Sequence, residues 1–495
     1  MKLYSAQNMQ EADKAVISSG IPSQLLMEIA GQKVADYALE HWQAAKSFLI
    51  LCGKGNNGGD GYVAARYLTL RDKKVTVLEL SSEPATEDAK VARAAFQAVG
   101  ECFAMERLEA ALPDAHLIID GLFGSGLNRP LEADLKNIVT ALNDSGKEIL
   151  SIDIPSGLSA DKVVPIGPHV NARRTLQLAG PKLASVFYPA RAAFGLWDVA
   201  DIGIPQSILQ DKSNINLLND EFAARNAPHR DALAHKYSVG TVLVIAGSSR
   251  YLGAAEMACR AAYRGGAGLV TLAAESRLPG SWPEIIFEPL NWLEEPLKAI
   301  STIAENRAQT RVIGPGLDSV AEPFLADLIR QSKAPTVLDA GALAPSREWF
   351  RAVKEQGNCV ITPHAGEAAK LLDTRSEAVL HNPLESARQL TEVTGATTVL
   401  KGATSVITHG DEVWVSTRGH PGMATGGTGD VLAGLIGSFV TGGELAKRVA
   451  VAVYIHGRAG EAAAQLYGNG LVATDLLEQI PQMLKSCLRH ENTAG

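Results

Sequence analysis

The sequence predicts an α/β protein of two domains. Short apolar runs of strand length alternate with longer segments of helical pattern, which is typical of a parallel sheet covered by helices. The chain has 495 residues, more than one domain of about 150 residues needs. Between residues 205 and 239 the alternation gives way to polar and charged sequence. We therefore expect a domain boundary there, with domains at residues 1–212 and 213–495.

Each expected domain has its own series of strands. In the first domain we expect strands at Phe48–Cys52, Val75–Leu78, Leu117–Asp120 and Ile149–Asp153. In the second we expect them at Thr241–Ala246, Leu269–Ala273, Arg311–Gly314, Thr336–Asp339, Cys359–Thr362 and Thr398–Lys401. The two series share a class but not an order of motifs, so they do not indicate a duplication.

Composition and charge exclude several classes of protein. Apolar residues make up 46% and charged residues 20%, which excludes collagen, coiled coil and general disorder. The net charge of −8, without a basic cluster, excludes nucleic acid as the main partner. The five cysteines form no CxxC motif and have no metal-ligand spacing with histidine, so we expect a cytoplasmic protein without disulfides. The N-terminus lacks the apolar core of a signal peptide, and Asp430 interrupts the longest weakly polar stretch, so we expect no membrane association.

A glycine-rich loop follows the first expected strand. Gly53, Gly55 and Gly58 spell GxGxxG before a helix expected to start near Tyr62, and an acidic residue, Glu79, follows about 20 residues later, as in dinucleotide-binding folds. However, Asp60 would put a carboxylate at the helix N-terminus, where a pyrophosphate would otherwise bind. This argues against simple phosphate binding of the Rossmann type.

Oxygen-bearing side chains recur where the first strands end. Ligands of open α/β sheets bind outside the carboxyl ends of the strands. One pocket is therefore expected to collect Asn57, Asp120, Asp153 and Ser156, whose oxygens suit a weakly held cation and a polar ligand. The alternative is that each Asp caps a helix and each Gly turns the chain, which three such motifs together disfavour.

These motifs resemble a known family. The loop at residues 53–61, Asp120 with its Gly-Ser-Gly loop, and the Asp-Ile-Pro-Ser-Gly run at residues 153–157 are similar to the YjeF-type N-terminal domain, the NAD(P)H-hydrate epimerase, over residues 1–210. The resemblance implies a Rossmann-like three-layer sandwich. It also implies a K⁺ site at Asn57, Asp120 and Ser156. It implies binding of the hydrated dinucleotide by Asn56, Asn57, Gly58, Gly59, Asp60, Gly124, Ser125, Gly126, Leu127, Asn128, Arg129, Pro130 and Asp153.

The family's epimerase interconverts the R and S forms at C6 of the hydrated nicotinamide, through ring opening or a cationic intermediate. Asp153 is our candidate for stabilising positive charge at the ring. Lys182 is a candidate for proton transfer, although a surface or structural role is favoured for it.

The second expected domain contains a sharper signal. A glycine-rich run at residues 421–430 ends in Asp430 and leads into an apolar helix at residues 431–439. Glycines at a helix N-terminus offer free amides to an anion, and Asp430 can accept a proton from a hydroxyl held beside it. This arrangement suits phosphoryl transfer. The alternative is that Asp430 is only a first-turn carboxylate favoured by the helix dipole.

The neighbouring loops carry a second resemblance. Over residues 215–490 the chain is similar to the ribokinase-like NAD(P)H-hydrate dehydratase. The similarity lies in the order and the sequence of the segments at residues 246–255, 314–316, 339–343, 362–367 and 401–405. It implies that the hydrated dinucleotide contacts Ala254, Gly316, His364 and Asp430, and that an adenine nucleotide binds Lys401, Gly402, Ala403, Thr404, Ser405 and Gly429. Both halves together resemble the bifunctional bacterial repair family, which implies ADP with Mg²⁺ as phosphoryl donor, AMP as product and a homo-oligomer.

The residues then suggest one mechanism and two alternatives. Asp430 would deprotonate the C6 hydroxyl while the amides of residues 426–429 stabilise the transferring phosphoryl group. One alternative is a kinase of a small alcohol such as a vitamin precursor, because the same elements serve any hydroxyl. Another is that the first domain only senses a ligand or acts as a scaffold.

Overall fold

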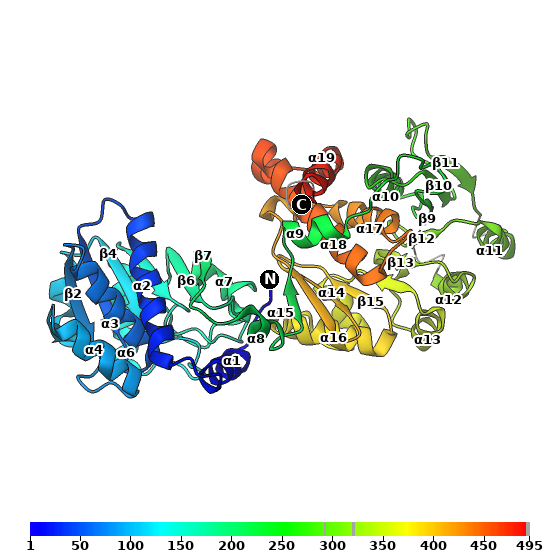
Figure 1. Ribbon diagram of the computed structural model, residues 1–495. Coiled ribbons are helices and arrows are strands. Elements are labelled where there is room, and N and C mark those ends of the chain that lie inside the picture. Colours follow the sequence, from blue (N-terminus) through cyan, green and yellow to red (C-terminus); the bar gives the residue numbers. More distant parts are fainter. Residues whose placement is uncertain (292–293, 319–321, 492–495) are drawn as a thin grey trace. The chain divides into compact units, whose positions relative to one another are not determined.

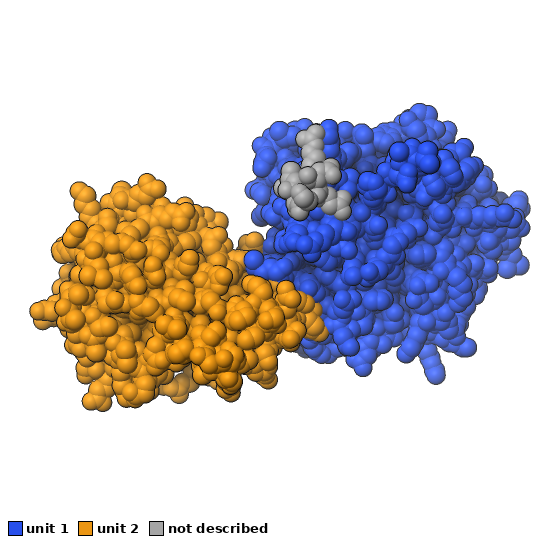
Figure 2. All heavy atoms as spheres, viewed as in Figure 1, with its two compact units in different colours: residues 1, 216–495 blue, residues 2–215 orange. Residues whose placement is uncertain are grey.

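The computed structural model describes residues 1–291, 294–318 and 322–491. The contacts divide the chain into two compact units, residues 2–215 and residues 216–495 with Met1 (Figure 2). We call them the N-terminal and the C-terminal unit and describe each by itself. In the part of the chain that the structure describes, no helix is long and apolar enough to cross a membrane.

The N-terminal unit is built on a seven-stranded parallel sheet of described residues, in the order β3-β2-β1-β4-β5-β6-β7 (Figure 1). The strands are β1 (Ser47–Cys52), β2 (Lys74–Glu79), β3 (Cys102–Ala104), β4 (Leu117–Gly121), β5 (Glu148–Ile152), β6 (Arg174–Leu178) and β7 (Leu196–Ala200). The strand order reverses between β1 and β4, and ligands of such sheets bind at this switch point. The α/β class is confirmed, and the four expected strands of this domain each appear within one residue of their expected ends.

Helices cover both faces of this sheet. The helices are α1 (Ala6–Ser18), α2 (Ser23–His41), α3 (Asn56–Thr69), α4 (Glu87–Gln97), α5 (Leu108–Ala111), α6 (Ala133–Asp144), α7 (Arg191–Phe194) and α8 (Gln206–Gln210). Ile50 and Cys52 of β1 belong to a buried cluster with α2 and α3, whereas Leu49 and Leu51 belong to a cluster with α5 and α6. This alternation gives three layers, because successive side chains of a strand point to opposite faces.

The helix after the first glycine-rich loop begins earlier than expected. We expected its start near Tyr62, but α3 begins at Asn56. Glycines allow this, because a Cβ on Gly53 would lie 1.8 Å from the Leu122 carbonyl oxygen and one on Gly58 would lie 2.0 Å from the Gly53 carbonyl oxygen. Asp60 therefore lies one turn inside the helix, and the first turn is free of acidic residues. The argument that a carboxylate at this N-terminus repels phosphate is wrong.

The C-terminal unit is built on a ten-stranded sheet of described residues, in the order β11-β10-β9-β12-β13-β14-β15-β16-β17-β8. The strands are β8 (Ile215–Leu217), β9 (Thr241–Ile245), β10 (Leu269–Ala274), β11 (Ile286–Pro289), β12 (Thr310–Ile313), β13 (Thr336–Leu338), β14 (Cys359–Ile361), β15 (Thr397–Leu400), β16 (Ser405–His409) and β17 (Glu412–Ser416). The strands from β11 to β15 are parallel, and β15, β16 and β17 pair antiparallel. The six expected strands of this domain are present, each within one residue of its expected ends.

The helices of this unit are α9 (Asp220–Asn226), α10 (Leu252–Arg264), α11 (Pro296–Glu305), α12 (Leu325–Arg330), α13 (Arg347–Gln356), α14 (Ala365–Leu371), α15 (Ser376–His381), α16 (Pro383–Thr394), α17 (Thr428–Phe439), α18 (Leu445–Tyr467) and α19 (Ala473–Glu491).

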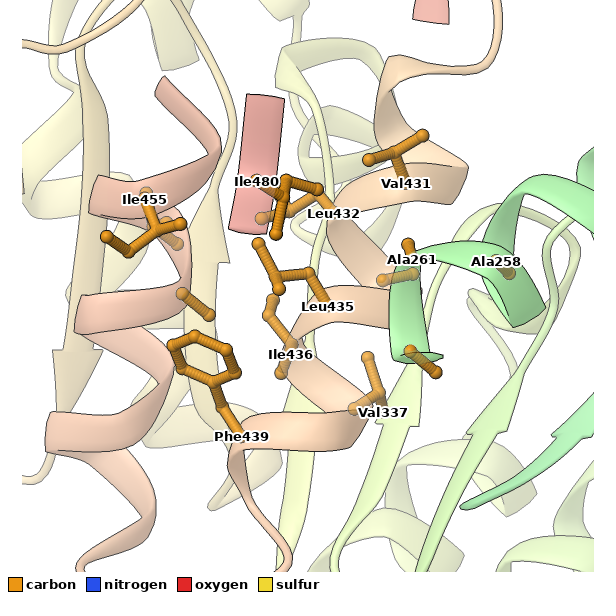
Figure 3. Packing of buried hydrophobic residues seen from close by; sticks show 14 of the residues in the cluster. Ala258, Ala261, Val337, Val431, Leu432, Leu435, Ile436, Phe439, Ile455 and Ile480 are labelled. Carbon is orange, nitrogen blue, oxygen red and sulfur yellow. The ribbon is translucent and has the colours of Figure 1, made fainter. Parts of the chain in front are cut away.

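One of these helices, α17, is packed on all sides. Figure 3 shows Leu432, Leu435 and Phe439 of α17 among side chains of the surrounding elements. A Cβ on Gly434 would lie 2.0 Å from the Ala258 carbonyl oxygen. This close packing fixes the N-terminus of α17, where the second candidate site lies.

Candidate functional sites

The N-terminal unit contains a cavity of about 960 Å³ beside the residues that follow β1, β4, β5 and β6, with α1 and α2 contributing to its wall. A cavity of this size accommodates a nucleotide-sized ligand. Of the side chains and loops expected to bind the hydrated dinucleotide, those lining it are Asn56, Asn57, Asp60, Gly124, Ser125, Gly126, Leu127 and Asp153.

Five of the expected binding residues do not line the cavity. Gly58 and Gly59 are buried beneath it, where a Cβ on Gly59 would lie 2.6 Å from Met27. Asn128, Arg129 and Pro130 are exposed beyond the cavity-lining part of the loop. The guanidinium of Arg129 lies 3.9 Å from the carboxylate of Glu132, and both side chains are 79% exposed. The structure therefore gives these five residues no direct part in the cavity.

Asp153 is held in place by a buried lysine. It directly follows β5 and adopts a left-handed backbone conformation with φ +65°, which costs a non-glycine residue free energy. Its Oδ1 accepts a hydrogen bond from the Leu178 N–H at 3.1 Å and forms an ion pair with Lys182. Only 1% of the Lys182 side chain is exposed, so of the surface or structural role that we favoured for it the surface part is wrong.

Asp120 lies beneath the cavity and is saturated by hydrogen bonds. Its Oδ2 accepts from the Ser151 hydroxyl at 2.8 Å and the Ser156 N–H at 2.9 Å. Its Oδ1 accepts from the Ser156 hydroxyl at 2.5 Å and the Leu122 N–H at 3.3 Å. Burial raises the pKa of Asp120, although these hydrogen bonds oppose the shift. Asp120 and Ser156 therefore come together as expected, but in a layer below Asn57 and Asp153.

The charge of Asp120 has no protein counter-ion within reach. Asp120 is fully buried, and no lysine, arginine or histidine of the described residues forms an ion pair with it. The nearby Asn57 has a buried side-chain nitrogen without a hydrogen-bond partner, and a Cβ on Gly124 would lie 3.1 Å from its Oδ1. Buried charges and amides normally have partners. The site thus offers oxygen ligands and an uncompensated negative charge to a monovalent cation.

Two further carboxylates face this cavity, from α1 and α3. Burial raises the pKa of Asp60 well above its usual range, and the charges of Asp153 and Asp13 add to the shift. Burial also raises the pKa of Asp13, while Lys182 opposes it. Asp13 was not among the expected site residues, because nothing local marks a residue of α1 as a neighbour of the loop after β5.

Glu79 does not act as the ribose ligand that a Rossmann fingerprint would require. Its carboxylate accepts hydrogen bonds from Arg93 at 2.7 and 2.8 Å and from the Tyr62 hydroxyl at 2.9 Å. Burial alone would raise the pKa of Glu79, but Arg93 and Tyr62 hold it below its usual value. Glu79 is therefore engaged within the unit and is absent from the cavity lining.

In the C-terminal unit the glycine-rich loop presents free amides. Gly427 is the N-cap of α17 and has φ +97°, a conformation that favours glycine. The backbone N–H groups from Gly426 to Asp430 have no hydrogen-bond acceptor among the described residues, and the first intrahelical bond is that of Val431 to Gly427. Free amides at a helix N-terminus attract anions. The loop therefore has the backbone of an anion site.

Lys401 completes this positive region. Its Nζ lies 2.6 Å from Oδ1 of Asp339 and 4.0 Å from Oε2 of Glu367, and a Cβ on Gly429 would lie 3.4 Å from it. The hydroxyl of Thr362 also donates to Asp339, at 2.7 Å. Burial lowers the pKa of Lys401, but Asp339 and Glu367 outweigh it and hold the pKa above its usual value. Lys401 and Gly429, two of the expected nucleotide ligands, therefore lie together.

Asp430 lies in the first turn of α17 beside this cluster. Burial raises its pKa from 3.8 to about 6, the charge of Asp339 adds to the shift, and Lys401 opposes it. A carboxylate of this pKa is ionised at neutral pH and basic enough to take a proton from a polarised hydroxyl. The simple capping role does not account for its position, partly buried and near a second carboxylate, Asp339.

His364 is the N-cap of α14. Its Nδ1 accepts hydrogen bonds from the N–H groups of Gly366 and Glu367, at 3.0 and 3.3 Å, so the neutral ring carries its proton on Nε2. The side chain is 59% exposed and is not a packed core histidine. Its Nε2 remains available to a ligand, 3.5 Å from Oε1 of Glu367.

The remaining expected residues form two further groups. Ala254 and Gly316 lie side by side, because a Cβ on Gly316 would be 2.8 Å from that of Ala254. Gly402, Ala403 and Thr404 form the turn between β15 and β16, and Ser405 begins β16. In this turn Gly402 and Ala403 are exposed while Thr404 is buried.

His456 was not among the expected residues. It is buried in α18, and its Nε2 lies 2.9 Å from the Thr428 carbonyl oxygen, to which it donates. Burial lowers its pKa to about 4, so the ring is neutral. A single histidine within α18 gave no sequence signal for this contact with the loop. In the described ranges no group of three or more His, Cys, Asp or Glu side chains could hold a metal ion.

Comparisons with known proteins match the two units to two family models. Residues 23–184 match the family described as YjeF-related protein N-terminus, and residues 242–482 match the family described as NAD(P)H-hydrate dehydratase. A bifunctional NAD(P)H-hydrate repair enzyme of Moorella thermoacetica is 36% identical and covers 98% of this chain and 97% of its own length. One of Coxiella burnetii is 33% identical and covers 97% of this chain and 98% of its own length.

A solved structure resembles the C-terminal half. It is an ADP/ATP-dependent NAD(P)H-hydrate dehydratase from Bacillus subtilis, co-crystallised with ATP and Mg²⁺. It is 29% identical, with a TM-score of 0.49, and the alignment covers 55% of this chain and 99% of that one.

Proposed function

The chain belongs to the family of bifunctional NAD(P)H-hydrate repair enzymes, and from this premise we propose how its two sites divide the work. It is an NAD(P)H-hydrate epimerase and dehydratase in one polypeptide. We assign epimerisation to residues 1–212 and dehydration to residues 213–495. The observation that carries the assignment of the chemistry is Asp430, a partly buried carboxylate beside free amides and Lys401.

The reaction explains why a phosphoryl-transfer site serves a dehydratase. Hydrated NAD(P)H carries a hydroxyl at C6 of the nicotinamide ring, and hydroxide is a poor leaving group. Phosphorylation converts it into a phosphate ester, which leaves readily. Loss of phosphate from C6 and of a proton from C5 restores the double bond. With ADP as donor the products are NAD(P)H, AMP and phosphate.

Asp430 is the general base of this step. It takes the proton of the C6 hydroxyl, whose oxygen then attacks the terminal phosphorus of the donor, and AMP departs. The free N–H groups of residues 426–429 stabilise the charge on the transferring group, and Lys401 adds a positive charge beside Gly429. Asp339 positions Lys401 through their 2.6 Å ion pair.

The adenine nucleotide is bound by Lys401, Gly402, Ala403, Thr404, Ser405 and Gly429. Mg²⁺ bound with the nucleotide phosphates would neutralise part of their charge, because Mg²⁺ is usually held by substrate phosphates with one or two carboxylates. Ala254, Gly316 and His364 contact the hydrated dinucleotide, and His364 can donate from Nε2.

The N-terminal site supplies the epimer that the dehydratase uses. Dehydration consumes the S form, and epimerisation converts the R form into it, so one chain clears both. Asn56, Asn57, Asp60, residues 124–127 and Asp153 bind the substrate in the cavity. Asp153, fixed by Lys182, stabilises positive charge at the ring.

A K⁺ ion is proposed at Asn57, Asp120 and Ser156. Their fit is supported by the fully buried Asp120, which forms no ion pair among the described residues, and by the oxygen atoms that the three side chains carry. When bound, the ion supplies the positive charge that the site lacks. We also propose a homo-oligomer and a cytoplasmic location; sedimentation of the purified chain tests the first.

The experiment that tests the proposed function uses a mixture of both NADH-hydrate epimers with Mg²⁺, K⁺ and either ADP or ATP. Reduced-nicotinamide absorbance is followed at short times, when spontaneous epimerisation contributes little. Complete rapid recovery is expected with ADP. Recovery that stops at the S fraction would reduce the N-terminal unit to a binding module. A stable phosphorylated product without recovery would instead indicate a small-alcohol kinase.

A further inference from the structure

In the cavity of the N-terminal unit, three carboxylates act on one another, and two of them also act on the Lys182 ammonium. Asp13 comes from α1, Asp60 from α3 and Asp153 from the loop after β5, and all three line the cavity with Lys182. Because one cation can compensate only one of them, the three carboxylates cannot all be ionised at low cost. Their hydrogen bonds indicate which of them carries the stable charge.

Asp153 holds the stable charge and Lys182 is committed to it. The Lys182 ammonium donates to Asp153 and to the Leu178 carbonyl oxygen at 2.7 Å. Asp153 also accepts from the Leu178 N–H. With two of its three protons held in place inside the unit, Lys182 is poorly suited to carry protons to and from a substrate.

Asp60 is in the opposite situation. It is 6% exposed, lines the cavity and has no hydrogen-bond partner among the described residues. The groups facing it are the carboxylates of Asp13 and Asp153 and the buried thiol of Cys52 on β1, while α2 contributes the apolar Met27. Burial favours the neutral form of Asp60, and the negative charges of Asp153 and Asp13 add to this effect. A neutral carboxyl that opens onto a ligand cavity is an acid ready to give up its proton.

We propose that Asp60 donates the proton that removes the C6 hydroxyl during epimerisation, and that Asp13 accepts the proton when water adds back. This rests on the proposed epimerase function. Asp60 protonates the hydroxyl, the C6–O bond breaks with its electron pair on oxygen, and water leaves. The lone pair of N1 then shares the positive charge of the ring, beside the ionised Asp153. Water forms a new C6–O bond on the opposite face and loses its proton to Asp13. Solvent exchange returns the two carboxyls to their starting state, and nothing is consumed.

The test starts from pure S hydrate without nucleotide, so that the dehydratase is silent, and follows formation of the R form above the uncatalysed rate. Asp60→Asn is expected to slow the catalysed reaction by about 100-fold or more, as loss of a general acid does. Asp60→Glu restores part of the rate. The matched control is Asp72→Asn, an exposed aspartate of the same unit whose φ of +57° asparagine tolerates, and it keeps the wild-type rate.

Two further readouts separate this inference from others. In water enriched in ¹⁸O, the wild-type chain incorporates one label at C6 for each epimerisation, because the C6–O bond breaks. Epimerisation without label would overturn the proposal in favour of ring opening. Asp60→Asn as fast as Asp72→Asn would overturn the role of Asp60, whereas a wild-type chain with no epimerase activity would refute the proposed function itself. Dehydration of the S hydrate with ADP is unchanged in Asp60→Asn.

Discussion

The two units each bury an aspartate at the carboxyl end of a central parallel strand, but they compensate its charge differently. Asp339 follows β13, is 2% exposed and pairs with Lys401 at 2.6 Å. Asp120 lies in β4, is fully buried and receives hydrogen bonds from two serine side chains and two backbone N–H groups. Hydrogen bonds stabilise a carboxylate but do not cancel its charge. Among the described residues, the C-terminal unit thus gives its buried aspartate an ion-pair partner and the N-terminal unit does not, which is why we propose a cation at Asp120.

The largest expected effect concerns the chemistry beside the compensated aspartate. Asp430→Ala removes the proposed base and is expected to slow ADP-dependent dehydration by about 10²- to 10⁴-fold. Epimerisation by the same protein is expected to be unchanged, because the N-terminal cavity is built from other residues. The measurement is recovery of reduced-nicotinamide absorbance from S hydrate. Dehydration at a near wild-type rate would remove Asp430 from the role of base.

The second prediction breaks the compensation at Asp339. Lys401→Met leaves this buried carboxylate unpaired, which typically costs about 3 to 5 kcal/mol. We expect the denaturant midpoint of the C-terminal unit to fall accordingly, and Asp339→Asn in the same chain to recover most of the loss. The unfolding of each unit must be followed separately. A Lys401→Met protein as stable as the wild type would mean that Asp339 is compensated by something other than Lys401.

The third prediction concerns the stability cost of Asp430. The pKa of Asp430 is raised from 3.8 to about 6 in the folded protein. At a pH between these two values, the folded state therefore keeps a proton that the unfolded chain has lost. The free energy of unfolding therefore falls as the pH rises from about 4 to about 6, by up to about 3 kcal/mol for a shift of this size.

Asp430→Asn removes this penalty. The variant is expected to be more stable than the wild type at neutral pH and equally stable below about pH 4, although it is inactive as a dehydratase. Thermal or denaturant unfolding across this pH range provides the measurement. A destabilised variant at neutral pH would show that the Asp430 carboxylate is held by favourable contacts rather than strained by burial.

The smallest expected effect tests the uncompensated aspartate. A K⁺ concentration ten times its dissociation constant stabilises the folded N-terminal unit by about 1.4 kcal/mol through mass action. We expect the free energy of unfolding of the N-terminal unit to be higher by this amount in KCl than in the chloride salt of a bulky organic cation at equal ionic strength. No comparable difference is expected for the C-terminal unit. Ser156→Ala should reduce the difference in the N-terminal unit, and Asp120→Ala should abolish the K⁺ dependence of epimerisation. Epimerisation that keeps its K⁺ dependence in Asp120→Ala would remove the cation site.

Local pattern predicted much of the fold. The apolar runs at β1, β4 and β9 were found because central parallel strands are buried on both faces and read as continuous apolar sequence. β6 was missed, because its buried polar residues have specific partners. The Thr175 hydroxyl donates to the Phe194 carbonyl oxygen, and the Gln177 side chain accepts from the Lys182 N–H. No pattern of hydrophobicity shows such partners.

The start of α3 was misjudged for a related reason. Glycine has a low helix propensity, so residues 56–61 suggested a loop. In the fold a Cβ on Gly58 would lie 2.0 Å from the Gly53 carbonyl oxygen, and one on Gly61 would lie 2.9 Å from the Cys52 sulfur of β1. Tertiary contacts outweigh the low helix propensity of glycine here. Asp60 therefore lies inside the helix, at the wall of the cavity, and not at the helix terminus.

By itself the sequence determined the α/β class, the glycine loops at the strand ends and the chemical character of Asp153 and Asp430, because periodic burial and turn chemistry are local properties. Only the tertiary structure decided that Lys182 neutralises Asp153, that Lys401 neutralises Asp339 across 62 positions, and that Asp120 forms no such ion pair with any residue the structure describes. These pairings depend on which strands are neighbours and in which register. That information is absent from the spacing of residues along one chain, and it sets the charge state on which the chemistry of both sites depends.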